Sequence, residues 1–298
     1  MLTEQYGIKR YSLKLKVLVL GSTGMIGHQV YNYLKSNTDY ELSNISHRKK
    51  LNADTILLDI KQEKVFLETI EKIKPDIIIN CIGILINESN NNQKNAIFIN
   101  AYMPHRLMEL ADDVDAKLIH ISTDCVFSGS KKTPYIENYE KDGKDIYAKT
   151  KGLGEIINDK HLTLRTSVVG PELKEDGEEL FHWFMSQKGT INGFSKSIWS
   201  GVSSLELARA VKWAIKNDIT GLYHITNNES INKYDLLNLF KKHTKKNIKI
   251  NRVDGRDVNK SFLDTRREIN YVVPSYNDMI KEIVDQTKTN KEMYGYDI

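Results

Sequence analysis

A tyrosine and a lysine four residues apart are the side chains of this sequence best suited to move a proton. The spacing Tyr-x-x-x-Lys puts both on one helix face, one turn apart, and it occurs at Tyr147 with Lys151 and at Tyr31 with Lys35. A cation beside a phenol lowers its pKa from the ordinary value of about 10, which acid–base chemistry near neutral pH requires. Because both residue types are frequent, the spacing alone decides nothing.

Position along the chain favours the second pair. Tyr31 lies on the helix expected after a glycine turn, where a packing or surface residue is expected. Tyr147 follows, by a loop, the strand expected at 117–122, which is followed directly by Thr123. A hydroxyl at the carboxyl end of a strand is well placed to meet a ligand. The plain alternative is a surface tyrosine and a solvated lysine, Lys151, on an ordinary helix.

A ligand on which Tyr147 and Lys151 act must be held by another element. A glycine turn between an apolar run at 17–20 and a helical stretch at 26–34 is suited to hold it. Its first glycine permits a sharp turn, its second lets the backbone approach a pyrophosphate, and its third lets the helix pack close to the sheet. The open amides and the positive helix end then face the phosphates. The binding residues expected here are Gly21, Thr23, Gly24, Met25, Ile26 and Gly27.

Short apolar runs alternate with amphipathic stretches in the first half, which predicts crossover units and a parallel sheet. Strands are expected at 17–20, 40–45, 55–58, 76–80, 117–122 and 162–165, with helices at 61–73 and 97–111. In the second half, helices are expected at 178–187, 204–216, 231–242 and 275–285, and strands at 222–225 and 248–253. The expected fold is α/β, a Rossmann-type doubly wound parallel sheet with a smaller C-terminal substrate-binding lobe.

The expected division of the chain is an N-terminal extension at 1–15, a dinucleotide-binding domain at 16–165 and a lobe at 166–298, partly interleaved with the sheet. The formal net charge of +4 is too small and dispersed to argue for nucleic acid. No apolar stretch approaches the ~20 residues of a membrane span, and the start lacks a signal-peptide core, so a cytoplasmic protein is expected.

The cysteines and histidines indicate no further chemistry. Two cysteines, Cys81 and Cys125, make a disulfide framework improbable, and Cys81 has no evident histidine partner for a nucleophile's role. The eight histidines lack ligand spacing, so no metal site is expected, and His120, inside a strand, is expected to be a satisfied core residue.

Four motifs in order resemble the extended short-chain dehydrogenase/reductase family, most closely its dTDP-4-dehydrorhamnose reductase branch, over about Lys16 to Ile283. They are the glycine turn, Asn80-Cys81-Ile82-Gly83, Ser122-Thr123-Asp124-Cys125-Val126-Phe127-Ser128-Gly129 and the pair Tyr147 and Lys151. Cys125 stands where that branch commonly has tyrosine, and Ser128 where an acidic residue is frequent. These departures bear on the particular sugar rather than on the reaction.

The resemblance implies an oxidoreductase that reduces the 4-keto group of a sugar carried on a nucleotide diphosphate. Hydride would come from reduced nicotinamide and the proton from Tyr147, whose pKa Lys151 would lower while also holding the nicotinamide ribose. Thr123 would align the substrate carbonyl, and Asp124 would bind the sugar's hydroxyls. The candidate catalytic residues are Thr123, Tyr147 and Lys151, and the substrate residues Thr123, Asp124 and Tyr147.

The residues after the second strand indicate which dinucleotide is bound, because an acidic residue there would bind the ribose 2′-hydroxyl of NAD. This chain has Ser46-His47-Arg48-Lys49-Lys50 and no carboxylate. A guanidinium suits a 2′-phosphate, so NADPH is expected, with NADH as the alternative and an unliganded basic loop as the plain reading. The resemblance implies cofactor contacts from Arg48, Asp59, Ile60, Cys81, Ile82, Gly83, Ile121, Tyr147 and Lys151.

Two sugars compete as substrate, dTDP-4-keto-L-rhamnose and a UDP-linked 2-acetamido-4-keto-6-deoxyhexose, both for a surface polysaccharide. The substrate is expected between Thr123, Tyr147 and the second lobe, and the candidates to meet it there are Arg165, Trp183, Lys196, Trp199 and Arg266. The alternatives are a non-catalytic NADP-binding subunit resembling the regulatory subunit of methionine adenosyltransferase, and an epimerase or dehydratase of the same family. A homodimer is the expected assembly.

Overall fold

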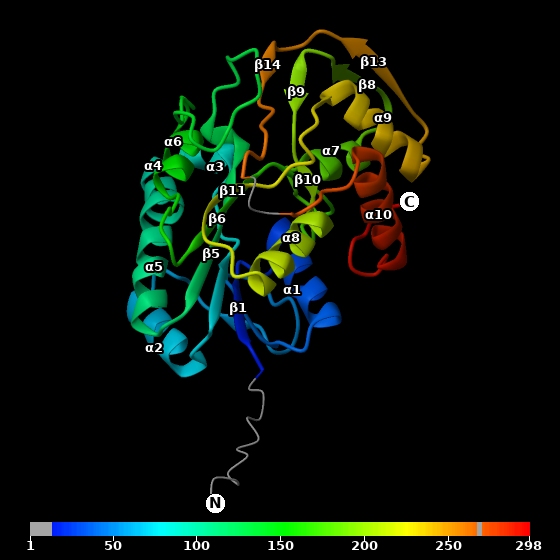
Figure 1. Ribbon diagram of the computed structural model, residues 1–298. Coiled ribbons are helices and arrows are strands. Elements are labelled where there is room, and N and C mark those ends of the chain that lie inside the picture. The colour runs from blue at the N-terminus through cyan, green and yellow to red at the C-terminus, as the bar shows by residue number, and fades with distance from the viewer. Residues whose placement is uncertain (1–13, 267–269) are drawn as a thin grey trace, which may run out of the picture.

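A parallel sheet forms the centre of the structure, a computed structural model that describes residues 14–266 and 270–298 (Figure 1). Within those residues seven strands lie in the order β11-β6-β5-β4-β1-β2-β3, and every neighbouring pair is parallel. The strands are β1 (Lys16–Leu20), β2 (Glu41–Ser46), β3 (Ile56–Leu57), β4 (Ile77–Asn80), β5 (Lys117–Thr123), β6 (Leu162–Thr166) and β11 (Gly221–His224). The predicted doubly wound sheet is confirmed, and the strand order reverses between β1 and β4, where such sheets bind ligands.

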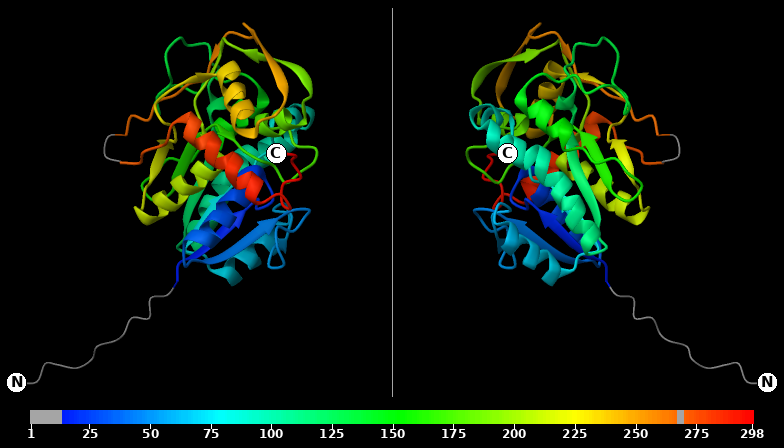
Figure 2. Two further views of the ribbon diagram at one scale, coloured as in Figure 1. Left: turned by 90° about the vertical axis from the view of Figure 1, so that its right-hand side faces the viewer. Right: turned by 90° about the vertical axis from the view of Figure 1, so that its left-hand side faces the viewer.

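Helices cover both faces of the sheet (Figures 1 and 2). One face carries α1 (Met25–Asn37) and α8 (Ser204–Lys216), and the other α2 (Glu63–Ile73) and α5 (Met103–Asp113). Alternate residues of β1 divide between the two cores: Val17 and Val19 pack toward α1, and Leu18 and Leu20 toward α2 and α5. A strand buried on both faces must be apolar throughout, which explains the unbroken runs seen in the sequence.

The connection from β4 to β5 is more complex than the single helix predicted at 97–111. It contains α3 (Ile86–Asn91), α4 (Gln93–Ala96) and a π-helix, η1 (Ile97–Tyr102), before α5. Asn100 in the π-helix receives the N–H of Ile84 at 2.9 Å and donates to the carbonyl of the same residue at 3.0 Å. A Cβ on Gly154 would lie 2.0 Å from the carbonyl oxygen of Asn100, so α6 (Ile146–Leu153) ends in close contact with η1.

The C-terminal lobe lies beyond the carboxyl edge of the sheet, at the top of Figure 1. Its strands pair as β8 (Gly189–Phe194) with β13 (Ile248–Val253), as β7 (Val168–Val169) with β10 (Val202–Ser203), and as β9 (Ser197–Trp199) between β12 (Ile231–Asn232) and β14 (Val258–Asn259). Its other elements are α7 (Leu180–Ser186), α9 (Lys233–Thr244) and α10 (Tyr276–Thr289), and a 3₁₀ turn, η2 (Asp124–Val126), follows β5. The predicted start of the helix at 231–242 is wrong, because residues 231–232 form β12 and pair with β9, and the helix begins at Lys233. Asn232 caps this helix by accepting the Asp235 N–H.

The C-terminal residues return to the N-terminal half after α10 (Figure 2). The Tyr294 hydroxyl accepts a hydrogen bond from Gln29 Nε2 at 2.8 Å and lies 3.0 Å from His28 Nε2. His28 Nδ1 in turn lies 2.8 Å from the carbonyl oxygen of Gly24. Sequence positions 24 and 294 are thereby joined through one imidazole.

The predicted boundary at 165/166 and the role of the extension at 1–15 stay predictions, and residues 1–13 lie outside the described residues. The second half nevertheless supplies β11 to the main sheet. No helix in residues 14–266 and 270–298 has both the length and the apolar character needed to cross a bilayer.

Candidate active site

A cleft at the carboxyl edge of the sheet brings together residues from both halves of the chain. Its volume is about 160 Å³. The residues that line it are Gly24, Met25, Ile26, Cys81, Ile82, Gly83, Leu85, Ile121, Ser122, Tyr147, Lys151, Glu172, Lys174 and Glu179. Nine of the residues expected from the sequence to bind cofactor or react are in that set, and all of them come from segments that end at this one edge.

The glycine turn forms one wall and leaves no room for side chains. A Cβ on Gly27 would lie 2.2 Å from the carbonyl oxygen of Gly21, and Gly21 has a φ of +76°, which favours glycine. The amide of Gly21 donates to Ile45 O at 2.9 Å, which ties the turn to the end of β2. Thr23 lies between the glycines. This cradle fits a pyrophosphate at the start of α1, as the motif predicts.

Tyr147 lines the cleft from the first turn of α6. Asp145 caps that helix by accepting the Ala148 N–H at 2.7 Å, which fixes where the Tyr147 side chain emerges. Burial raises the pKa of the phenol well above its usual range, and Cys125 adds to this, while the neighbouring Thr123 hydroxyl acts in the other direction. The protein's own groups therefore favour the protonated phenol, the form that can give up a proton.

Lys151 lies one turn further along the same helix face and is buried. Its Nζ donates to the carbonyl oxygen of Ile121 at 2.8 Å and lies 3.5 Å from His120 Nε2. Burial lowers the pKa of Lys151 to about 8, against the opposing charge of Glu155. The expectation that this lysine lowers the pKa of Tyr147 stays a prediction, since burial dominates the raised pKa of the phenol in the protein alone.

Thr123 and Asp124 form the corner where β5 passes into η2. The Thr123 hydroxyl donates to Asp124 Oδ1 at 3.2 Å and accepts the Cys125 N–H at 3.1 Å. Both side chains are buried beside Tyr147. Cys125 is no nucleophile here, since burial raises the pKa of its thiol to about 12.

Two lysines that sequence reasoning missed approach this corner from the small sheet β12-β9-β14. Lys260 follows β14 and donates to Cys125 Sγ at 3.3 Å. Lys233 follows β12, lies 5.1 Å from the ring centroid of Trp199, and faces Asp124. In the described parts of the chain neither ammonium lies within ion-pair distance of a carboxylate. Both side chains are half-buried, and an anionic ligand would offset the cost of removing their charges from water.

Two carboxylates were also missed, Glu172 and Glu179, which line the cleft from the loop before α7. The Glu179 amide donates to Glu172 Oε1 at 2.8 Å. Burial, together with the charge of Glu172, raises the pKa of Glu179 to about 7. Nothing in the local sequence distinguishes these residues from the exposed acids around them.

The residues expected to contact the adenosine end of the cofactor are not among those that line the cleft. Arg48 is exposed beyond the end of β2. Asp59 follows β3, accepts the Lys61 N–H at 3.0 Å and lies 3.4 Å from His47 Nε2. Ile60 is buried in the core. Their proposed contacts stay predictions.

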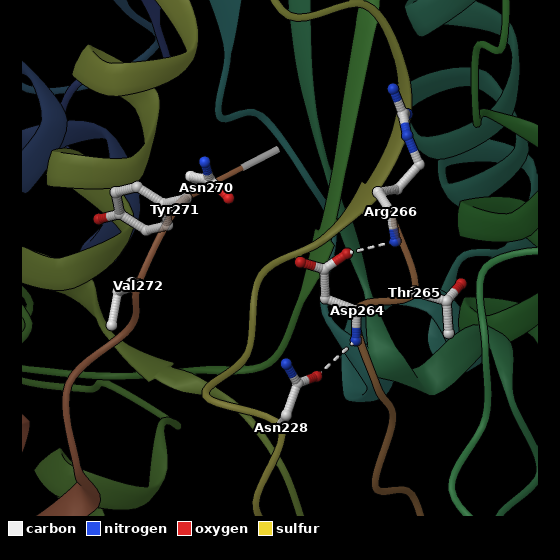
Figure 3. Close-up of a pocket in the computed structure, with 7 residues that line it drawn as sticks. All are labelled: Asn228, Asp264, Thr265, Arg266, Asn270, Tyr271 and Val272. Carbon is white, nitrogen blue, oxygen red and sulfur yellow. Dashed lines mark hydrogen bonds between the residues drawn. The ribbon is translucent and has the colours of Figure 1, made fainter. Parts of the chain in front are cut away.

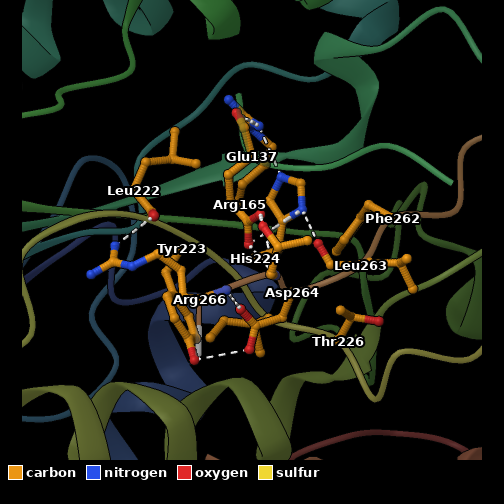
Figure 4. A network of polar contacts seen from close by, with 12 residues as sticks. Glu137, Arg165, Leu222, Tyr223, His224, Thr226, Phe262, Leu263, Asp264 and Arg266 are labelled. Atoms are coloured by element: carbon orange, nitrogen blue, oxygen red, sulfur yellow. Dashed lines mark hydrogen bonds and ion pairs between the residues drawn. The ribbon is translucent and has the colours of Figure 1, made fainter. Parts of the chain in front are cut away.

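The prediction that Arg165 meets a substrate diphosphate is wrong, because the side chain is buried in an ion pair with Glu155. Figure 4 shows Arg165 beside His224 and Glu137. Its Nε and Nη2 donate to the two carboxylate oxygens of Glu155 at 2.8 and 2.7 Å, and its Nη1 lies 2.8 Å from His224 Nε2. Ser122 donates to the same carboxylate at 2.7 Å, and Lys141 Nζ lies 3.2 Å from it. Arg165 thus supports the floor of the cleft from below.

The other predicted substrate residues are dispersed. Trp199 is buried, and its Nε1 donates to Ser167 Oγ at 2.7 Å. Trp183 is partly exposed on α7, and Lys196 is exposed, with its Nζ 2.7 Å from an oxygen of Asp254. Arg266 donates to Leu222 O at 3.0 Å and borders a second hollow.

That second hollow has a volume of about 530 Å³, and Figure 3 shows its lining. The lining residues are Asn228, Asp264, Thr265, Arg266, Asn270, Tyr271 and Val272. None of the residues expected to be catalytic lines it, whereas Tyr147 and Lys151 line the first cleft.

Known proteins resemble the chain along most of its length. A reductase of Salmonella typhimurium named dTDP-4-dehydrorhamnose reductase is 25% identical over 221 residues, which cover 71% of this chain and 72% of that protein. Methionine adenosyltransferase 2 subunit beta of Xenopus tropicalis is 27% identical over 236 residues, covering 74% and 70%. A solved dTDP-4-dehydrorhamnose reductase of Bacillus anthracis, in complex with NADP, superposes with a TM-score of 0.79 at 22% identity, covering 93% of this chain and 99% of that one.

The family model described as the RmlD substrate binding domain matches residues 15–268. The match spans the sheet, the cleft and most of the C-terminal lobe, and it confirms the resemblance that the motifs around Gly21, Thr123 and Tyr147 indicated. The chain belongs to the RmlD substrate binding domain family.

Proposed function

We propose that this chain is an NADPH-dependent reductase of the 4-keto group of a nucleotide-diphosphate-linked 6-deoxy-4-keto-hexose. One observation carries the proposal: Tyr147 and Lys151 line the same cleft as the glycine turn. The family supports it, since relatives such as the Salmonella typhimurium protein are named for this reduction. The NADP in the Bacillus anthracis neighbour supports the cofactor.

The glycine turn and the strand ends around it are the residues proposed to hold the dinucleotide. Gly24, Met25 and Ile26 would meet its pyrophosphate with backbone amides, and Cys81 to Gly83 would run along the ribose. Arg48, exposed at the end of β2, would meet a 2′-phosphate. When bound, reduced nicotinamide supplies the hydride that reaches the carbonyl carbon.

The protein's own residues would deliver the proton and orient the ketone. Tyr147 would donate its phenolic proton to the carbonyl oxygen, and the Thr123 hydroxyl would hydrogen-bond the same oxygen and align it. Lys151 would restore the proton to the phenolate. Asp124 would bind the sugar's hydroxyls.

Lys233 and Lys260 take the place of Arg165 as the proposed substrate cations. They reach the Asp124 corner from the lobe, where no carboxylate of residues 14–266 and 270–298 forms an ion pair with them, and each side chain can donate to acceptor oxygens of the substrate. Lys260 contacts Cys125 and Lys233 faces Asp124, so they would hold the sugar or its diphosphate against the end of β5.

The test is NADPH consumption with a panel of dTDP- and UDP-linked 4-keto sugars, with and without a 2-acetamido group. Turnover with at least one is expected, and the preferred member identifies the sugar. The non-catalytic alternative is favoured by the methionine adenosyltransferase subunit among the relatives. Folded protein that binds NADPH and oxidises it with none of the sugars would support that alternative. Turnover of a 4-hydroxy sugar without net NADPH loss would support an epimerase.

Homodimer formation, a location in the cytoplasm and a role in surface polysaccharide synthesis are parts of the same proposal. Sedimentation of the purified protein at several concentrations measures the first of these.

A further inference from the structure

The amine of Lys151 has two neighbours inside the protein besides its own helix. It donates to the carbonyl oxygen of Ile121 at 2.8 Å, and it lies 3.5 Å from Nε2 of His120, an imidazole with no exposed surface. A carbonyl oxygen can only accept, so the first contact suits an amine and an ammonium alike. The second contact depends on which ring nitrogen of His120 carries the hydrogen.

Asn80, the last residue of β4, determines which ring nitrogen of His120 carries the hydrogen. Its Oδ1 accepts the N–H of Ile82 at 3.1 Å, and this fixes which end of the amide points along the strand. Its NH₂ group therefore faces His120 Nδ1, at 3.1 Å, and can only donate. His120 Nδ1 must be a bare acceptor. Because burial also keeps this imidazole neutral, lowering its pKa well below the ordinary value, its hydrogen sits on Nε2.

An N–H directed at Lys151 distinguishes the two charge states of that lysine. An ammonium would face it donor to donor, whereas a neutral amine would accept its hydrogen through the nitrogen lone pair. We propose that Asn80 and His120 are positioning residues that aim Nε2–H at Lys151 and so favour its neutral amine. The catalytic role of this arrangement rests on the proposed function, whereas the arrangement of Asn80, His120 and Lys151 does not depend on it.

The other charged and titratable groups facing Lys151 oppose this effect. Glu155, just beyond α6, and Cys81, after β4, each favour the ammonium. Tyr147 shares its helix face, and His105 of α5 faces the imidazole. Burial of Lys151 opposes Glu155, and the N–H of His120 would act in the same direction as burial, which keeps the amine able to gain or lose a proton near neutral pH. After Tyr147 has given its proton to the ketone, an N–H bond of the ammonium breaks and the phenolic O–H re-forms.

The first test needs no substrate. NMR of isotope-labelled histidine in the full chain distinguishes the tautomers by the ring nitrogen that carries hydrogen. We expect His120 to carry it on Nε2 at every pH at which the protein is folded. Hydrogen on Nδ1, or a doubly protonated ring near neutral pH, would overturn the proposal even if no variant were stable.

The second test replaces the Asn80 amide, which donates to His120 Nδ1, with a group that can only accept a hydrogen bond. In Asn80→Asp the carboxylate can only accept, so His120 should move its hydrogen to Nδ1 and offer a bare Nε2 to Lys151. The pKa of Lys151, followed by NMR of labelled lysine, should rise by about one, a tenfold change in the amine fraction at a given pH. Asn44→Asp adds a carboxylate at another buried asparagine of the sheet and should leave the tautomer and the lysine titration unchanged.

A reversed tautomer with an unmoved Lys151 titration would overturn the proposal, as would an equal rise in both variants. Failure of the proposed function looks different, because it is NADPH oxidation absent with every sugar while the tautomer and titration results stand. Where turnover is found, the pH profile of kcat should move with the pKa of Lys151 in Asn80→Asp and stay in place in Asn44→Asp.

Discussion

Replacing Glu155 by glutamine should be among the most destabilising single changes in the chain. Its side chain is fully buried and receives three hydrogen bonds, two from Arg165 and one from Ser122, beside Lys141. Burial alone would raise its pKa, but the hydrogen bonds and charge of Arg165 outweigh burial, so the pKa of Glu155 is lowered and the group is charged.

Glutamine keeps the volume but turns an NH₂ group toward the donors of Arg165, whose guanidinium is then buried without a counter-charge. Removing one partner of a buried pair costs about 3–5 kcal/mol. That is a large share of the roughly 5–15 kcal/mol that holds a domain folded. With a urea slope of about 3 kcal/mol per molar, the unfolding midpoint should fall by roughly 1–1.7 M.

The assay is urea unfolding of the protein without ligands, followed by circular dichroism. Asp254→Asn is the matched control, because its partner Lys196 is exposed and such pairs are worth about 0–1 kcal/mol. The double variant Glu155→Leu, Arg165→Met removes both buried charges and should recover most of the loss. A Glu155→Gln midpoint within the error of the control, or a double variant no better than the single one, would refute the reasoning.

Four further results are expected. Tyr147→Phe should lose turnover by about 100-fold or more while NADPH affinity, measured by fluorescence, stays the same; retained turnover would mean that another group is the acid. Arg48→Ala should raise the Kd of NADPH at least about tenfold more than that of NADH, and equal losses would contradict a 2′-phosphate contact. Lys233→Met should raise the substrate KM about tenfold or more, whereas Lys196→Met should not. Because burial raises the pKa of Glu179 from 4.5 to about 7, the folded protein binds more protons than the unfolded chain between those values, so stability should fall as pH rises through that window. Glu179→Gln should flatten that pH dependence in thermal unfolding, and an unchanged slope would assign it to other groups.

The sequence allowed the sheet to be predicted because its strands are buried on both faces and therefore read as unbroken apolar runs. Helix α8 was predicted with the bounds that the structure has, since Ser203 caps it through the Glu206 N–H at 3.1 Å and its apolar face is regular. The short strands of the lobe, two or three residues each, are set by contacts between distant segments and leave no local pattern. The π-helix at 97–102 was hidden for the same reason.

The structure brings predicted site residues together where residue type and strand end coincide, as at Thr123 and in the glycine turn, and their roles stay predictions. It failed where a partner decides the role. An arginine at the end of β6 looks like a diphosphate ligand until Glu155, ten residues earlier, is seen to neutralise it. Lys233 is one of the 43 lysines and arginines of the chain, and only the pairing of β12 with β9 shows that it reaches Asp124.

The bond that Tyr294 makes with Gln29 and His28 has a consequence for how the protein is made. The phosphate cradle is translated long before Tyr294, the residue whose contact steadies its helix. A nascent chain stalled in the lobe would hold a complete set of glycines but an unbraced α1. Cofactor capture should therefore wait until the segment after α10 has been made and has folded onto α1.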